Sequence, residues 1–216
     1  PDHAVVIDPL TADRIEIIRG PAALRYGPNA MGGTINVVRG QIPSNNVGHV
    51  HGSVSLQGES VNRGLSGGGA MTGPLGPLAF RFDGSARTAS DIATPKGKLL
   101  NTPYRNFNAS AGLSLVEQWG FAGVAAGTYV SRYGIPGGFV GAHPKGVRIE
   151  LQRQHLQAKA EWFGLFPSVR RLEAEFAFTD YFHQEFESNG ALGIEFGVLT
   201  YSGEIAAHTP AWGPFS

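Results

Sequence analysis

Residues 14–38, RIEIIRGPAALRYGPNAMGGTINVV, decide the fold of this chain. The first five residues are rich in isoleucine and predict a strand, which the Gly-Pro pair at 20–21 ends. Pro21 suits the first position of a short helix through Arg25, because its missing N–H is not needed there. Gly27 fits a left-handed helix stop, and the glycine pair at 32–33 allows the chain to reverse. Thr34 to Val38 is β-branched and predicts a second strand.

This stretch resembles the end of the plug domain of TonB-dependent outer-membrane receptors. In that family a motif close to RIEVxRGPxxxxYGxxAxGGxIN closes the plug just before the β-barrel begins. The alternative reading is a soluble α/β turn with coincidental glycines. The matching residues are Arg14, Ile15, Glu16, Arg19, Gly20, Pro21, Tyr26, Gly27, Ala30, Gly32, Gly33, Ile35 and Asn36.

The composition supports a chain of many closely packed strands. The 216 residues include 31 glycines and no cysteine, and the formal net charge is zero. Zero net charge argues against a nucleic-acid partner, and the lack of cysteine excludes disulfides and thiolate metal sites. No apolar run is long enough for a membrane-spanning helix. Because the chain has no initiator methionine and no signal peptide, we expect an internal piece of a longer precursor.

From Val47 onward, alternating apolar and polar residues predict about eight antiparallel strands. The alternation places Phe80, Phe82, Leu113, Phe176, Phe178 and Ile205 on one face, and Arg81, Asp83, Glu173, Glu175 and Glu204 on the other. In a barrel the first set faces lipid and the second faces the lumen. Residues 147–162 change phase between Leu151 and Leu156, which predicts a β-bulge. The expected strands are 49–57, 64–72, 78–87, 107–115, 121–131, 147–162, 172–183 and 199–208.

The connections alternate in length, which favours an outer-membrane barrel. Residues 73–77, 117–120 and 164–168 are short turns, whereas 89–105, 132–146 and 187–196 are longer loops; the hairpin near 59–63 is short. The fold class is therefore mainly β. We expect the C-terminal part of an α+β plug (1–40), a linker (41–46) and about eight strands (47–216) of a barrel that has 22 strands in the resembled family. A secreted β-sandwich for adhesion or carbohydrate binding is the alternative.

The resemblance also implies site residues in the plug. Glu16 and Arg19 occupy positions whose charges hold the plug to the barrel wall in that family, so we expect them to form a plug latch. Glu150, Arg153, Glu173 and Glu175 are the candidate wall partners. Gly20, Pro21, Gly27, Gly32 and Gly33 are expected to form the plug turns.

The histidines and later segments bear on the cargo. His49 and His51 share a strand face and could reach one ion, or line the lumen as polar residues. The segments near Tyr133 and His183 resemble receptors for zinc, haem or siderophores, but a zinc loop rich in histidine is replaced here by a short loop with only His143. Tyr133, His143 and His183 are therefore the candidate ligand contacts. No catalytic motif occurs, and we expect no enzyme activity, resident metal or cofactor.

The resemblance implies a receptor in the bacterial outer membrane, in contact with its lipid, that imports a scarce metal chelate. Energy would come from TonB, acting on a segment upstream of Pro1.

Overall fold

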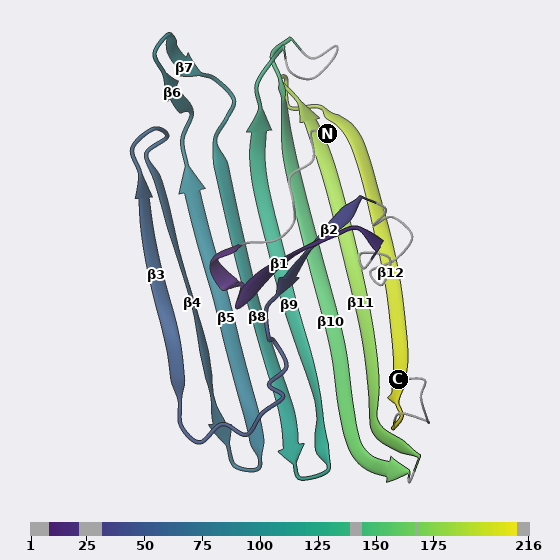
Figure 1. The fold of residues 1–216 in the computed structure, drawn as a ribbon. Helices are drawn as coiled ribbons and strands as arrows, with labels where there is room; N and C mark the ends of the chain where they lie inside the picture. The colour runs from purple at the N-terminus through teal and green to yellow at the C-terminus, as the bar shows by residue number, and fades with distance from the viewer. Residues whose placement is uncertain (1–8, 22–31, 139–143, 167, 211–216) are drawn as a thin grey trace.

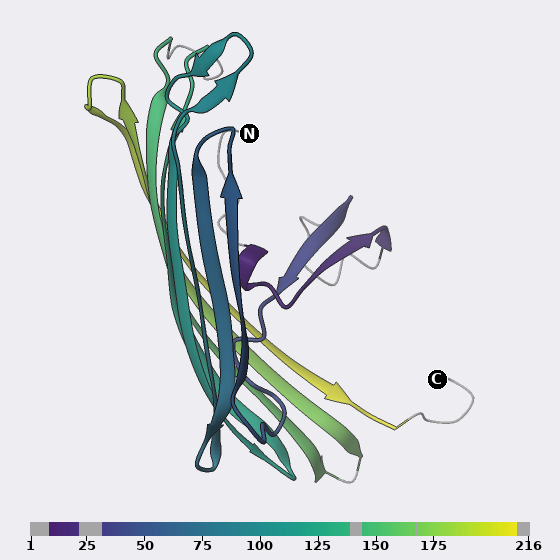
Figure 2. The ribbon, with the colours of Figure 1, turned by 90° about the vertical axis from the view of Figure 1, so that its left-hand side faces the viewer.

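The computed structural model describes residues 9–21, 32–138, 144–166 and 168–210. A single curved antiparallel sheet of eight strands, here called the wall, carries a short plug segment on its concave side (Figures 1 and 2). The plug segment contains the 3-10 helix η1 (Pro9–Thr11) and the strands β1 (Arg14–Arg19) and β2 (Gly33–Val38). The wall strands are β3 (His51–Glu59), β4 (Gly64–Leu75), β5 (Leu78–Ala89), β8 (Tyr104–Glu117), β9 (Gly120–Ile135), β10 (Val147–Phe166), β11 (Val169–Glu187) and β12 (Leu192–His208).

The wall is a meander in which each strand pairs with the next wall strand along the chain. The order β12-β11-β10-β9-β8-β5-β4-β3 contains no crossover. Two packed sheets, which the sandwich alternative requires, do not occur among the described residues. The predicted run of eight antiparallel strands is confirmed.

The two faces of the wall have different chemistry. Val54 and Leu56 are 85% and 80% exposed on the convex face, where Phe82 and Leu113 also lie uncovered. Asp83, Asn108 and Ser131 are buried on the concave face. Broad exposure of large apolar side chains suits contact with lipid rather than with water. The predicted division of Phe82 from Arg81 and Asp83 is confirmed.

The bulge predicted within residues 147–162 is wrong. β10 keeps an unbroken register from Val147 to Trp162 against β9, and from Val147 to Phe163 against β11. The apolar residues Val147, Ile149 and Leu151 face the concave side, while Leu156 and Ala158 lie in the alternate phase on the convex side. The change of phase therefore marks an apolar patch on the concave face of the wall and not a β-bulge with an inserted residue.

The lengths of the connections agree with the prediction at the end of the wall with the short turns, and differ in part at the opposite end. The turns between β4 and β5, β8 and β9, and β10 and β11 are short, as predicted. The loop after β5 contains a small hairpin of β6 (Ile92–Thr94) and β7 (Gly97–Leu99). The predicted long loop at 187–196 is wrong, because strand pairing continues to Glu187 on one side and begins again at Leu192.

In the plug segment, β1 and β2 form an antiparallel hairpin that stands off the wall (Figure 2). Gly33 has φ of +140°, and a Cβ there would lie 2.8 Å from the carbonyl oxygen of Ile18, so glycine is required. Gly20 has φ of +76°. At Gly32 a Cβ would meet no atom within 4 Å, so the described contacts do not require glycine at that position. Residues 22–25 of the predicted helix, and Gly27, lie outside the described residues.

Within the described segments, no helix combines the length and apolar character needed to cross a membrane.

The face assignment predicts opposite responses of neighbouring residues on β11. Phe178→Arg places a charge on the convex face and should lower the free energy of unfolding of the full receptor by about 2–4 kcal/mol. Thr179→Arg, on the concave face, should cost little. Equilibrium urea unfolding in phospholipid vesicles measures both. Equal costs would contradict the assignment of the convex face to lipid.

Candidate functional site

The concave face of the wall holds the plug segment through a buried ion pair. Arg39, just after β2, places its Nη2 2.5 Å from Oδ1 of Asp83 on β5 and 3.2 Å from Oδ1 of Asn108 on β8. The side chain of Asp83 is 0% exposed and that of Arg39 is 10% exposed. Asp83 also accepts a hydrogen bond from the hydroxyl of Ser110, and Asn108 donates to the hydroxyl of Thr11. These bonds satisfy the buried carboxylate, as a buried charge requires.

A second ion pair lies beside the first, nearer to solvent. Arg81 on β5 places its Nη2 2.5 Å from Oδ1 of Asp13 and its Nη1 3.4 Å from the hydroxyl of Thr72. Gly40 has φ of +54°, and a Cβ there would overlap the Asp13 carboxylate. Glycine at position 40 therefore lets the chain turn past this pair and reach the wall.

The chain after Gly40 lies in a trough of glycines on the wall. A Cβ on Gly112 would overlap the carbonyl oxygen of Gln41, and one on Gly123 would lie 2.6 Å from a methyl carbon of Ile42. Ser114 donates a hydrogen bond of 2.5 Å to the carbonyl oxygen of Pro43. These contacts attach the segment expected to be a linker directly to β8 and β9.

Toward the end of the wall with the longer loops, the concave face becomes apolar and aromatic. A cluster of buried residues comes from β9 and β10 and packs against partly buried Tyr104, Ile135 and Tyr181. The hydroxyls of Tyr104 and Tyr129 lie 3.2 Å apart. We call this the upper cluster; its buried members are Tyr129, Tyr133, Val147, Ile149 and Leu151.

Three residues of one face of β11 form a hydrogen-bonded chain at the edge of the upper cluster. Nδ1 of His183 lies 2.9 Å from the hydroxyl of Tyr181, and Nε2 lies 3.2 Å from Oε1 of Glu185. The His183 ring stacks on Phe196 of β12, with centroids 4.6 Å apart. Because the His183 side chain is 0% exposed, a ligand can meet Tyr181 but not the imidazole directly.

Glu16 and Arg19, the predicted plug latch, are not joined in the structure to the four wall partners proposed for them. Glu16 accepts hydrogen bonds from Arg14 at 2.6 Å and from Asn36 at 2.9 Å, both inside the plug hairpin. The Asn36 bond, followed by the Arg14 bond, holds the pKa of Glu16 below its usual value. The wall partners Glu150, Glu173 and Glu175 pair instead with basic residues of the wall itself.

The sequence reading missed Arg39, Asp13 and the glycine trough. Arg39 stood at the end of the segment assigned to the plug, and no local pattern ties it to Asp83, 44 residues later. The sequence did contain one usable signal, the two charged residues Arg81 and Asp83 on the inner face of the same strand. Because a buried charge needs a partner of opposite charge, these positions indicated that oppositely charged residues from elsewhere in the chain should reach them.

The three predicted ligand contacts lie in different surroundings in the structure. Tyr133 belongs to the upper cluster, His183 is covered, and His143 lies outside the described residues. The rings of His49 and His51 are 5.8 Å apart at the start of β3. Within the described ranges, no group of three or more metal-binding side chains occurs.

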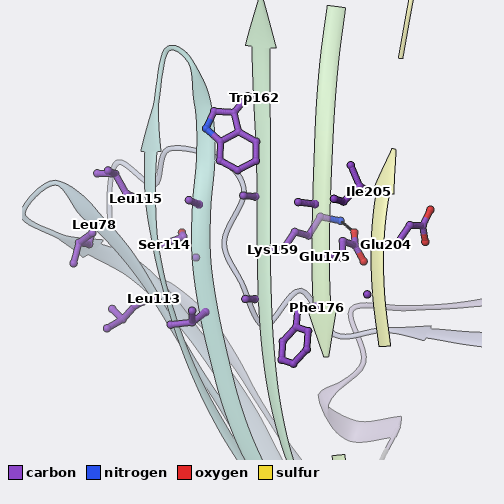
Figure 3. A pocket seen from close by; sticks show the side chains of 17 residues that line it. Leu78, Leu113, Ser114, Leu115, Lys159, Trp162, Glu175, Phe176, Glu204 and Ile205 are labelled. Atoms are coloured by element: carbon purple, nitrogen blue, oxygen red, sulfur yellow. Dashed lines mark hydrogen bonds and ion pairs between the residues drawn. The ribbon is translucent and has the colours of Figure 1, made fainter. Parts of the chain in front are cut away.

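A shallow apolar hollow lies on the convex face, outside the space that holds the plug. Small residues of β9, β10 and β11 form its floor, and Figure 3 shows Leu113, Trp162, Phe176 and Ile205 around it. The ring of Trp162 stacks on Trp119, with centroids 6.3 Å apart, near the short turns. Aromatic residues at this level suit an interfacial girdle.

Comparisons with known proteins agree with this architecture. Residues 2–34 match the family model of the TonB-dependent Receptor Plug Domain. The ferric enterobactin receptor of Pseudomonas aeruginosa is 38% identical over 88 residues, which are 37% of this chain and 11% of that protein. The hemin receptor of Yersinia pestis is 32% identical over 107 residues, which are 46% of this chain and 16% of that protein.

Solved structures extend the likeness to the whole wall. The copper transporter OprC superposes with a TM-score of 0.72 at 17% identity, covering 95% of this chain and 32% of that one. A ferric enterobactin receptor of Pseudomonas aeruginosa, in complex with enterobactin, gives a TM-score of 0.62 at 18% identity, covering 94% and 34%. The chain thus spans about a third of these structures.

A curved meander wall with a plug segment bound to its concave face defines the class of plugged outer-membrane β-barrels. The plug match and the fold agree: residues 2–34 belong to the plug-domain family of the TonB-dependent receptors, proteins of the bacterial outer membrane, and the wall has the fold of the receptor structures above.

The Arg39–Asp83 pair predicts a strong asymmetry between single and double variants. Asp83→Ala in the full receptor leaves a buried guanidinium without its carboxylate and should cost about 3–5 kcal/mol of plug attachment. Arg39→Ala with Asp83→Ala should cost less than that single change. Hydrogen exchange of the η1 and 39–43 backbone measures plug attachment, and additive effects of the two changes would contradict the pairing.

The glycine trough predicts a site-specific steric effect. Gly112→Ala should displace the 41–43 segment and increase its proteolytic cleavage, because the new methyl overlaps the Gln41 carbonyl. The control is Gly58→Ala on β3, where the nearest atom to a Cβ is 4.0 Å away. Limited proteolysis of both receptors in detergent provides the comparison, and equal cleavage would refute the docking of this segment.

Proposed function

We propose that the receptor containing this chain imports a metal chelate across the outer membrane. The observation that carries the proposal is a plug segment held by one buried and one partly exposed ion pair to a wall whose opposite face is apolar and suited to lipid. Such a plug blocks the lumen while it is in place, so passage requires a change in the plug. Receptors of this family are transporters and not enzymes.

The cargo class is supported by the relatives and by the upper cluster. The similar proteins are named as receptors for ferric enterobactin and hemin and as a copper transporter. Haem is a flat and largely apolar molecule, and a catecholate siderophore presents flat catechol rings; both suit aromatic surfaces that carry a few hydroxyls. The upper cluster offers such a surface through the partly buried Tyr104 and Tyr181, which pack against the buried Tyr133.

The site residues have separate roles in this proposal. Tyr133 and Tyr181 contact the chelate, and His183 holds the hydroxyl of Tyr181. His143, in the loop after β9, is a further contact. Glu16 and Arg19 form a latch with wall strands beyond this chain, while Gly20, Pro21, Gly27, Gly32 and Gly33 shape the plug turns.

Energy coupling belongs to the same proposal. TonB would pull on plug residues that precede this chain, and the force would reach the wall through Arg39 and Asp13. A buried ion pair adds little net stability but is costly to break from one side, so it keeps the plug seated until it is pulled.

The proposal predicts a loss of energised uptake. Deletion of the gene should lower the accumulation of one of three radiolabelled cargoes, ferric enterobactin, haemin or copper, by roughly tenfold or more under metal limitation. Collapse of the proton gradient should have the same effect on the wild type. Unchanged uptake of all three cargoes would refute the proposal.

Matched variants locate the cargo contact. Complementation with Tyr133→Ala should weaken cargo binding by about tenfold, whereas Val130→Ala, which faces outward on the same strand, should not. If both variants bind as the wild type does, the upper cluster is not the cargo surface.

A further inference from the structure

Asn101 lies where two outer connections of the wall meet, and both its backbone and its side chain are unusual. Its φ is +61°, and among the described residues only Arg63 shares a positive φ without being glycine. Its side-chain nitrogen donates hydrogen bonds of 2.8 Å to the carbonyl oxygen of Ile135 and 2.9 Å to that of Val147. Asparagine adopts this left-handed backbone more readily than most residues, but the conformation still has a cost. A strained residue that bonds the ends of two strands at once indicates a specific role.

Glycines leave the space that Asn101 occupies. A Cβ on Gly134 would overlap the carbonyl oxygen of Asn101, and one on Gly146 would lie 2.7 Å from its side-chain nitrogen. Gly146 also has φ of +77°. The backbone N–H of Gly134 donates a hydrogen bond of 3.0 Å to the carbonyl oxygen of Pro103. The chain between β7 and β8 therefore fits closely against the end of the β9–β10 hairpin.

The same connection is bonded to the β3–β4 turn at its other end. Ser90 donates its N–H to the carbonyl oxygen of Asn62 at 2.8 Å, and Ala93 donates to that of Val61 at 2.7 Å. Between these contacts and Asn101, Thr102 closes the base of the β6–β7 hairpin through hydrogen bonds with the chain at the start of β6. Three connections are thus joined into one hydrogen-bonded body. We call it the rim; it comprises residues 61–62, 90–103, 133–135 and 146–149.

The rim borders the upper cluster directly. Val147 is a buried member of that cluster and Ile135 packs against it, so Asn101 bonds the backbone of two of its residues. Tyr104 begins β8 immediately after the rim. It is the register partner of Tyr133, and the two ring centroids lie 6.3 Å apart. The position of the rim therefore sets where both tyrosines stand.

We propose that Asn101 is a positioning residue of the cargo surface, an inference that rests on the proposed function. Its two hydrogen bonds hold the rim as one body, so Tyr104 and Tyr133 keep their places before cargo arrives. A surface that is already ordered loses less conformational entropy when its ligand binds, and it binds that ligand more tightly. Asn101 itself touches no cargo and acts through the two carbonyl groups that it holds.

Two substitutions remove the donor in different ways. Asn101→Asp keeps the size of the side chain but replaces the donor with oxygen, and Asn101→Gly keeps the positive φ without a side chain. Hydrogen exchange of the full receptor in detergent should be about tenfold faster at residues 133–135 and 147–149 in both variants. Exchange at the wild-type rate in both variants would overturn the tie.

Asn189→Asp is the matched control. Asn189 stands in the turn between β11 and β12, and its Oδ1 accepts a hydrogen bond of 2.9 Å from the N–H of Ala191. Aspartate also provides this acceptor, so exchange and cargo binding should stay unchanged. Exchange at residues 121–125, beside the short turns, should keep the wild-type rate in the Asn101 variants. Faster exchange at both ends of the wall would show a general loss of assembly and overturn the local role.

Cargo binding separates a positioning role from a merely structural one. The probes are ferric enterobactin, haemin and copper, and Asn101→Asp should bind the one that the wild type takes up about tenfold more weakly. KM for energised uptake should rise by the same factor at an unchanged maximal rate, because the plug segment and its ion pairs are untouched. A lower maximal rate with unchanged KM, or wild-type affinity, would overturn the positioning role.

The two measurements also distinguish this inference from the proposed function. If the wild type binds none of the three probes, the proposed function fails, and the positioning role fails with it even where exchange shows the tie. If the wild type binds a probe and Asn101→Asp exchanges faster at the rim with the same affinity, only the positioning role is overturned.

Discussion

The hydrogen-bond ladder of the wall is the constraint on which the rest of the structure depends. Lipid offers no hydrogen-bond partners, so each backbone group of a membrane-exposed strand must bond to a neighbouring strand. The wall meets this requirement with a meander in which each strand pairs with the next, and nearly all registers are unbroken. Because the ladder holds the strands together, side chains on the concave face are available for contacts with the plug segment.

The concave face is divided into two zones with different chemistry. Near the plug, small and polar residues let the chain after Gly40 lie directly on β8 and β9, where Arg39 finds the buried Asp83. Beyond it, the upper cluster presents tyrosines and aliphatic residues. Ion pairs and hydrogen bonds can be exchanged for bonds to water if such a contact separates, whereas an apolar contact has no equivalent exchange. The concave face therefore carries two adjacent zones, a polar contact with the plug segment and the aromatic upper cluster.

The convex face also has an organisation along the membrane normal. Trp119 and Trp162 stack near the short turns, the middle is apolar, and the exposed Arg105 and Arg132 follow at the other end of β8 and β9. Each level matches the part of the bilayer that it would meet, from interface to hydrocarbon to headgroup. The same alternation that turns Asp83 inward turns the arginines outward, so one sheet carries both patterns.

The sequence by itself determined the strands, their faces and the glycine at position 33. These properties depend on residues close together in the sequence. A strand places alternate side chains on opposite faces, and Gly33 allows a backbone conformation with positive φ that other residues rarely adopt. Only the tertiary structure decided which charges meet. Arg39 and Asp83 are 44 residues apart, and Thr11 and Asn108 are 97 apart, so their contacts depend on where the chain crosses the concave face. The phase change in β10 was misread for the same reason: an apolar residue on a strand has the same pattern whether it faces lipid or an inner cluster, and only the packing of β9 and β10 distinguishes the two.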